Sequence, residues 1–305
     1  MTRQKLLVSW QWLQNDNQRS FYLAFLRVAL SIWLLKEVAI NWGSNEILYG
    51  QDTYVTLKDY GITKLLFIDA DFFHAHYLAF LGIYILLLLL NIAGIGKWVT
   101  ALLLFICYDI LQRQHIYLFS GGERMARLML FYMVFANSYE YFSLGKYQFA
   151  SEEARKFTNL LSNLAAISIM LQLCLAYLAS GLSKLDSPLW RNGTATYYIM
   201  SVDRFMGTPF NKSFVQHAWF IYLTNYFTLA FELLFPFFIW IKKCRKPLII
   251  LGVLFHLGIY VLMMIYGFQM LFILIYGLFL SNRQWINIYN KFSQLFNKKP
   301  LLKEG

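Results

Sequence analysis

The feature that most limits the fold of this chain is a series of apolar runs, each part of a stretch long enough to cross a lipid bilayer. Residues 81–90 read LGIYILLLLL, and residues 269–280 form a second example. About 20 consecutive apolar residues cross the ~30 Å hydrocarbon core of a membrane as one helix. Only 14% of the residues are charged, whereas a soluble protein usually has about a quarter. The sequence therefore predicts an integral membrane protein.

Eight segments of the chain have the length and the apolar character of membrane-crossing elements. Backbone polar groups in lipid must be satisfied within the protein, and continuous apolar runs of this length achieve that as helices. We therefore expect an all-α fold, a polytopic membrane helical bundle of about eight transmembrane or membrane-embedded helices. No composition break divides the chain, so residues 1–305 are expected to form one membrane domain without a separate soluble domain. The predicted segments lie near residues 20–42, 73–94, 97–117, 123–142, 158–183, 214–241, 247–265 and 267–282.

The distribution of lysine and arginine predicts the orientation of these segments. Residues 1–19, residues 242–246 and the C-terminal tail fall on one side of the membrane and carry more of these residues than the loops on the other side. Cytoplasmic loops are typically enriched in Lys and Arg. Both termini are therefore expected in the cytoplasm. Topology and anionic lipid explain the net charge of +11 better than nucleic acid does.

The N-terminus and the potential metal ligands favour simple interpretations. The first twenty residues lack a compact apolar region and a small-residue cleavage site, so no cleavable signal peptide is expected. His74 and His76 are two residues apart and face different sides of a helix, which favours interfacial histidines over a metal site. Cys107, Cys174 and Cys244 have no close-spaced partner and are expected to be buried thiols. No metal is predicted.

Lys184 is the first candidate for a functional role. It stands at the outer end of the fifth predicted segment, and Asp186 follows two residues later as a potential partner. An ionisable group at membrane depth is costly unless it is paired or hydrated. Two interpretations stay open: Lys184 extends its ammonium group to the membrane edge, or it is desolvated by apolar neighbours and serves as a base.

His115 is the second candidate, at the outer end of the third predicted segment. A pair of glycines and then Glu123 and Arg124 open the next segment. A turn followed by a helix start explains the glycines and Glu123, but it does not explain His115. The loops that carry His115 and Lys184 are separated by two spans and emerge on the same membrane face. We therefore expect His115 and Lys184 to share one outward-opening cavity.

Further polar residues lie within predicted spans. Glu232 and His256 are deep in the sixth and seventh segments and could pair with each other or with Arg27 in the first segment. A structural polar pair is the simpler interpretation, and a cofactor site or a proton path is the alternative. Glu37 is expected to pair locally with Lys36.

A pattern of small, aromatic and charged residues surrounds both candidates. Residues 177–186 read YLASGLSKLD and are followed by Trp190, Gly193, Tyr198 and the Pro209-Phe210 pair, while residues 115–119 read HIYLF. These two blocks resemble the vitamin K-dependent γ-carboxylase superfamily, whose shared membrane part is called the HTTM (horizontally transferred transmembrane) domain. The first block is fairly specific, the second is short, and a looser match joins Phe255-His256 to residues 268–270.

The resemblance implies a helical membrane domain in which Lys184 acts as the base on a reduced, vitamin K-like quinone and His115 assists at the carbanion. O2 and CO2 would take part if carboxylase chemistry is retained. The chain is also similar in size to short bacterial relatives that help mature a secreted toxin peptide in the sporulation-delaying system. The expected supporting residues are Asp186, Trp190, Glu123, Arg124, His256 and Glu232.

We therefore expect a protein of the bacterial inner membrane that modifies or matures a secreted peptide or protein at an outward-facing cavity. Its expected partners are membrane lipid, a secreted peptide or protein substrate and a membrane-associated accessory protein. The alternative is a non-catalytic membrane partner, immunity factor or export factor for a secreted peptide. A transporter is less favoured, because the sequence shows no clear inverted repeat or pair of broken helices.

Overall fold

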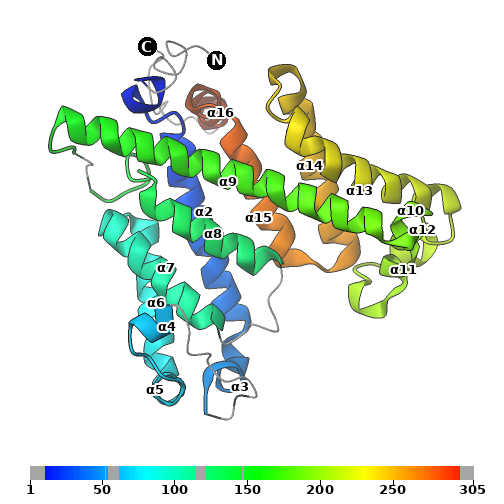
Figure 1. Cartoon of the computed structure of the whole chain (residues 1–305), viewed down its shortest axis with the longest axis horizontal. Coiled ribbons are helices and arrows are strands. Elements are labelled where there is room, and N and C mark those ends of the chain that lie inside the picture. Colours follow the sequence, from blue (N-terminus) through cyan, green and yellow to red (C-terminus); the bar gives the residue numbers. More distant parts are fainter. Residues whose placement is uncertain (1–10, 52, 54–61, 114–120, 146–147, 296–305) are drawn as a thin grey trace. The chain divides into compact units, whose positions relative to one another are not determined.

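The regular structure of the chain is helical. The structure is a computed structural model of the full chain and describes residues 11–51, 53, 62–113, 121–145 and 148–295. No strand occurs among these residues (Figure 1), and the predicted all-α class is confirmed. The helices are α2 (Ser20–Ile40), η1 (Trp42–Ser44), α3 (Asn45–Tyr49), α4 (Ile62–Leu65), α5 (Ala70–Ala75), α6 (Tyr77–Ala93), α7 (Lys97–Arg113), α8 (Gly121–Phe135), α9 (Glu152–Asp186), α10 (Pro188–Arg191), α11 (Ala195–Ser201), η2 (Asp203–Phe205), α12 (Phe210–Phe214), α13 (Ala218–Phe238), α14 (Lys242–Met263), α15 (Tyr266–Tyr276), η3 (Gly277–Phe279) and α16 (Asn282–Leu295).

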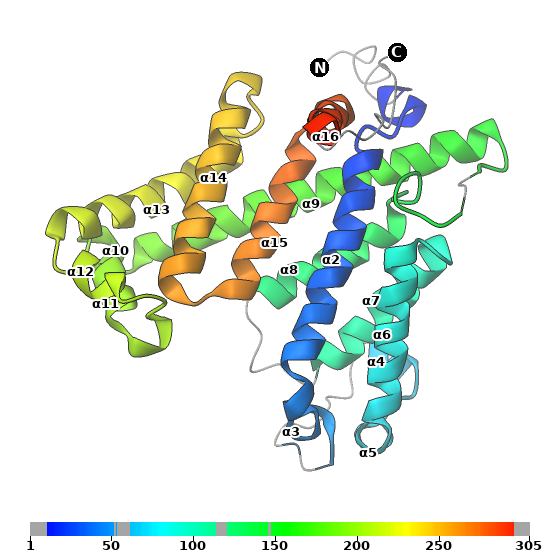
Figure 2. The ribbon, with the colours of Figure 1, turned by 180° about the vertical axis from the view of Figure 1, so that it is seen from behind.

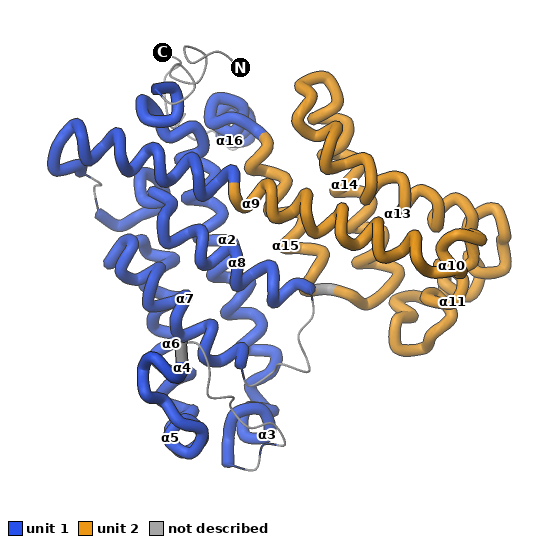
Figure 3. Tube along the Cα trace, in the orientation of Figure 1, with its two compact units in different colours: residues 1–167, 280–305 blue, residues 168–279 orange. Residues whose placement is uncertain are grey.

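The chain contains two compact units. Unit 1 comprises residues 1–167 and 280–305, and unit 2 comprises residues 168–279 (Figure 3). Helix α9 contributes its first half to unit 1 and its second half to unit 2. That residues 1–305 act as one membrane domain remains a prediction.

Helices occupy all eight predicted segments, but they differ in their ability to cross a membrane. Among the described residues, α9, α13 and α14 are both long and apolar enough to span one, while α6 and residues 267–279 are apolar but shorter. Helix α8 ends at Phe135, before the predicted limit of 142. At about 1.5 Å per residue, a fifteen-residue helix is shorter than the ~30 Å apolar layer. The count of eight full spans therefore stays a prediction.

Hydrogen bonds to other parts of the chain explain why α8 ends early. The N–H of Asn137 donates to Ser162 Oγ at 3.1 Å. The carbonyl of Ser138 accepts from Arg27 Nε at 3.2 Å. Both residues are buried. Because these backbone groups have partners outside the helix, the chain can leave the helical path without stranding polar atoms in the interior.

Unit 1 is built around the helices α2, α6, α7 and α8, which lie side by side in both views (Figures 1 and 2). Helix α16 packs on the start of α2, where the rings of Trp285 and Tyr22 stack at 4.6 Å between centroids. The side chain of Asn282 accepts from the N–H of Phe21 at 2.9 Å. The start of α2 is thereby tied to α16 through both ring packing and hydrogen bonding.

Unit 2 is built from the second half of α9 together with α13, α14 and α15 (Figure 2). The short helices α10, α11 and α12 gather at one end of α13 (Figure 1). Its interior is largely aromatic: the ring of Tyr177 on α9 contacts those of Phe231 and Phe235 on α13 and of Phe272 on α15, at 5.0–5.6 Å between centroids. Polar side chains within this aromatic interior must find partners among themselves.

Candidate functional site around Lys184

Lys184 forms a salt bridge with a carboxylate on a different helix. Its ammonium nitrogen lies 2.7 and 2.6 Å from the two carboxylate oxygens of Glu232 on α13. It also donates to Ser180 Oγ, one helical turn earlier on α9, at 2.7 Å. The side chains of Lys184 and Glu232 are only 20% and 9% exposed. All three donor positions of the ammonium group therefore have acceptors within unit 2.

Trp190 closes one side of this pair. The ammonium group of Lys184 lies 5.2 Å from the centre of the Trp190 ring, within cation–π range. Helix α9 ends at Asp186, and Pro188 starts α10, because proline is readily accommodated in the first turn of a helix. The side-chain amide of Asn225 on α13 donates to the carbonyl of Trp190 at 2.9 Å. Helix α13 thus positions both Glu232 and the turn that carries Trp190.

The close approach of α9 and α13 depends on Gly181. A Cβ atom at this residue would lie 2.8 Å from Leu233 Cδ2 and 3.4 Å from the Cβ of Glu232. Such distances leave no room for a side chain, and small residues commonly allow helices to approach closely in membranes. Gly181 therefore helps to set the distance at which Lys184 meets Glu232.

A second polar cluster lies inside unit 2. The hydroxyl of Tyr177 is hydrogen-bonded to Nε2 of His256 on α14 and to the hydroxyl of Tyr276 on α15. Nδ1 of His256 is hydrogen-bonded to the side chain of Gln269. His256 and Gln269 are 1% and 2% exposed. The four side chains, from three helices, thus form one continuous buried network.

The partners of Glu232, His256 and Arg27 correct the sequence prediction. Glu232 pairs with Lys184 rather than with His256 or Arg27. His256 is bonded to neutral side chains. Arg27, in unit 1, donates to backbone carbonyls instead of a carboxylate. The expected local pair of Lys36 and Glu37 is present at 2.9 Å.

Asp186 takes no part in the Lys184 site. It is exposed at the end of α9, and the carboxylate that reaches Lys184 comes from α13 instead. Residues two apart on a helix point in different directions, which explains why proximity in sequence was a poor guide. Ser180, in contrast, could have been found from the sequence, because it lies four residues before Lys184 on the same helix face.

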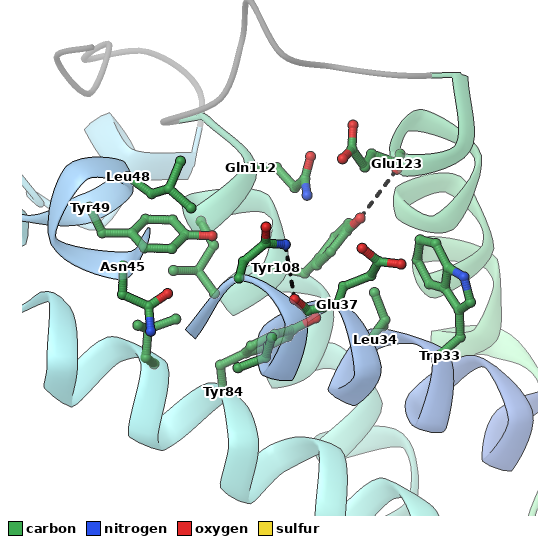
Figure 4. Close-up of a pocket in the computed structure, with 14 residues that line it drawn as sticks. Trp33, Leu34, Glu37, Asn45, Leu48, Tyr49, Tyr84, Tyr108, Gln112 and Glu123 are labelled. Atoms are coloured by element: carbon green, nitrogen blue, oxygen red, sulfur yellow. Dashed lines mark hydrogen bonds between the residues drawn. The ribbon is translucent and has the colours of Figure 1, made fainter. Parts of the chain in front are cut away.

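The proposed partnership of His115 with Lys184 stays a prediction, because His115 lies outside the described residues. The neighbouring Glu123 and Arg124 are in the first turn of α8, in unit 1. Glu123 lines a cavity together with Glu37 and Tyr108 (Figure 4). The hydroxyl of Tyr108 donates to the backbone carbonyl of Glu123 at 3.4 Å.

The remaining candidate ligands have ordinary structural surroundings. His74 is buried, and its Nδ1 lies 2.8 Å from the carbonyl of Tyr49, while His76 is exposed. Cys107 and Cys174 are buried free thiols, and Cys244 is half-buried. Within the described part of the chain, no three His, Cys, Asp or Glu side chains gather as a metal site would require.

The fold and the site define a helical membrane protein with a partly buried lysine–glutamate pair between two of its apolar helices. A family model for the HTTM domain matches residues 15–285, which is most of the chain. The chain therefore belongs to the HTTM-domain family, a group of vitamin K-dependent carboxylase-like membrane proteins, and is an integral membrane protein. Comparison with curated proteins and with solved structures gave no match.

Proposed function

We propose that this protein modifies or matures a secreted peptide or protein in the bacterial inner membrane, and that Lys184 is the central group of its site. The main support is the position of Lys184, held by Glu232, Ser180 and the ring of Trp190. Family membership adds to it, because the matched region includes the block around Lys184. The site would face outward if both termini are cytoplasmic.

The salt bridge limits how Lys184 can work. As an ammonium group, Lys184 donates to both oxygens of the Glu232 carboxylate, and a protonated amine cannot accept a proton. Lys184 can therefore act as a base only after one of its protons has moved away. The carboxylate of Glu232 is the nearest acceptor, so a transfer from Lys184 Nζ to a Glu232 oxygen would leave a neutral amine and a neutral acid.

The side chains around Lys184 fit the oxygen of a quinone or quinol. The hydroxyl of Ser180 can donate a hydrogen bond, Lys184 can donate one once it exchanges a present acceptor, and the Trp190 ring offers a flat apolar surface. With O2, a reduced quinone would supply the strong base that removal of a γ-proton from glutamate requires, and CO2 could then add. In this proposal Lys184 orients the quinol oxygen and accepts its proton, while His115 is the further group suggested by the family resemblance.

A non-catalytic role is the second candidate, and one observation favours it. Every donor position of the Lys184 ammonium group is already satisfied, as in a purely structural ion pair. Such a protein would serve as a membrane partner, immunity factor or export factor for a secreted peptide, together with a membrane-associated accessory protein.

Replacement of Lys184 by arginine separates these roles. Lys184→Arg keeps a positive charge that can pair with Glu232, but arginine does not lose its proton in proteins. The measurement is the mass spectrum of the peptides secreted by cells that carry each variant, together with the cellular phenotype. If Lys184 is a base, Lys184→Arg and His115→Ala abolish the modified product while the variants remain folded.

The matched control is Lys156→Arg, on the exposed first part of the same helix, where a Lys also lies near a glutamate. This variant should leave the product unchanged. A folded Lys184→Arg variant that still yields normal product and phenotype would exclude the base role and favour the non-catalytic alternative. The quinone proposal can fail while the peptide modification holds. Purified protein without a bound quinone, from cells in which the modified product still depends on Lys184, would contradict the quinone proposal alone.

A further inference from the structure

Unit 1 contains a cavity of about 160 Å³ that is separate from the Lys184 site. It is bordered by α2, α3, α6, α7 and α8, so that five helices contribute to its wall (Figure 4). A buried water occupies about 30 Å³ of liquid volume. The cavity therefore has room for a group the size of one side chain, rather than for a whole drug-sized molecule.

Polar side chains without a described hydrogen-bond partner lie on the cavity wall, and they include one donor, Nε1 of Trp33. Oε1 of Gln112 is buried without a hydrogen-bond partner in the described part of the chain. Tyr84 is only 3% exposed, and its hydroxyl forms no hydrogen bond with any described residue. The side chain of Asn45, which is 6% exposed, likewise forms no hydrogen bond with any described residue. Unused buried polar groups are costly, so their presence around a cavity indicates a missing partner.

The charge on the wall is negative. Glu37 from α2 and Glu123 from α8 both line the cavity, and Figure 4 shows the two side chains with Gln112 around the ring of Tyr108. No lysine or arginine is among the lining residues that the structure describes. Two carboxylates, an amide oxygen and a phenol accept hydrogen bonds, and together they favour a positively charged donor.

Aromatic rings complete the lining. Trp33, Tyr49, Tyr84 and Tyr108 all border the cavity. Faces of such rings attract cations. Lys36 already illustrates this preference at the edge of the site, because its ammonium nitrogen lies 2.9 Å from Glu37 and 5.8 Å from the centre of the Trp33 ring. The side chain of Lys36 is 44% exposed, so it can move aside.

We propose that this cavity binds the cationic group of an organic molecule, an alkylammonium or a guanidinium ion, with Glu37 and Glu123 as its counter-charges. Tyr84 and Gln112 would accept the remaining N–H groups, and the tyrosine rings would pack against the alkyl stem. The group can belong to a free small amine or guanidine, or to a lysine or arginine side chain of a peptide. The site lies wholly within unit 1, so the test of this proposal does not depend on the role of Lys184.

Binding of simple cations to the purified full-length protein in lipid nanodiscs tests this proposal. Calorimetry would compare butylguanidinium and butylammonium with butylurea, a neutral molecule of similar shape. We expect the cations to bind at least about tenfold more tightly than butylurea, as hydrogen bonds between charged groups predict. Acetylated, amidated Gly-Arg-Gly, with its citrulline counterpart as the neutral control, distinguishes the two sources of the cation. If this peptide binds more tightly than butylguanidinium, the natural ligand is a peptide side chain. If the peptide does not bind, the natural ligand is a free ion.

Four substitutions connect binding to the cavity. Glu37→Gln and Glu123→Gln should each weaken butylguanidinium binding by about tenfold, and Tyr84→Phe should weaken it less, since only a neutral acceptor is lost. Lys36→Met should strengthen binding, because a competing ammonium group is removed from Glu37. Glu153→Gln, an exposed glutamate on α9, is the matched control and should change nothing.

Thermal unfolding without ligand establishes which variants are folded. Equal binding of butylurea and butylguanidinium would overturn the proposal, as would failure of the wild-type protein to bind any of the cations. The same conclusion would follow if Glu37→Gln and Glu123→Gln, both melting like the wild type, kept full affinity.

Discussion

Gly252 on α14 lies directly against the hydroxyl group of Tyr276 on α15, and a Cβ atom at residue 252 would lie 2.5 Å from Tyr276 Oη. This space lets the Tyr276 hydroxyl reach Tyr177 inside unit 2. Gly252→Ala should therefore displace Tyr276 and lower the free energy of unfolding by about 1–3 kcal/mol, as for other overpacked interiors. Thermal unfolding of the detergent-solubilised protein measures the change.

Gly258 provides the control on the same helix, because nothing lies within 4 Å of a Cβ atom placed there. Gly258→Ala should be neutral or stabilise the protein by up to about 1 kcal/mol, through the higher helix propensity of alanine. Equal unfolding temperatures for the two variants would show that the contact of Gly252 with Tyr276 does not constrain the helices.

Gly181→Ala should separate α9 from α13 beside the Lys184–Glu232 pair, because the added Cβ would lie 2.8 Å from Leu233 Cδ2. We expect a loss of about 1–3 kcal/mol. Leu233→Ala in the same protein makes room for the new methyl group, so the double variant should be more stable than the sum of the single changes predicts. A strictly additive double variant would argue against this contact; Gly82→Ala, with open space around it, is the control.

The helices of this protein could be predicted from its sequence because the apolar runs are long and continuous, and each predicted segment does contain a helix. Their limits were less predictable where the chain leaves a helix for a distant partner. Helix α8 ends at Phe135 because Asn137 and Ser138 bond to Ser162 and Arg27. Those partners are far away in sequence, and no local sequence pattern predicts these hydrogen bonds.

The members of the Lys184 site could be named from the sequence, but their pairing could not. Lys184 and Glu232 stood out as ionisable residues in apolar segments. Glu232 was nevertheless expected to pair with His256 or Arg27, because Lys184 was placed at the outer end of its segment and Glu232 deep within another. Ser180 follows from helical spacing alone. Gln269 lies in the looser family match that also contains His256, but that match predicts no contact between them. Tyr276 carries no charge and no spacing marks it, so the packing of α14 against α15 is needed to show that both residues belong with His256.

The hydrogen bond between Tyr177 and Tyr276 should show strong coupling. Tyr177→Phe removes the hydroxyl that joins His256 to Tyr276, and it leaves buried polar groups without a partner. We expect a cost of about 1–3 kcal/mol for this single change. Tyr177→Phe combined with Tyr276→Phe removes both hydroxyls, so the second substitution should cost less than it does alone. Unfolding of the four proteins in a double-mutant cycle gives the coupling energy, and a value near zero would contradict the shared hydrogen bond.

Arg27 should be the most sensitive charged residue of unit 1. It is 1% exposed, and its guanidinium donates to five backbone carbonyls, those of Asn91, Ile92, Ser138, Tyr141 and Phe142. Arg27→Lys keeps the charge but offers fewer donors in a different geometry. It should cost about 2 kcal/mol or more, and Arg27→Met should cost more still, since buried carbonyls lose their partners.

Arg283→Lys, at an exposed position on α16, is the matched control and should change stability by no more than about 0.5 kcal/mol. Thermal unfolding reports the global effect, and limited proteolysis reports the segment after α8. Because the carbonyls of Ser138, Tyr141 and Phe142 belong to that segment, cleavage there should accelerate in Arg27→Lys before the helices unfold. An Arg27→Lys variant that is cleaved and unfolds like the wild type would show that these carbonyls do not depend on the guanidinium.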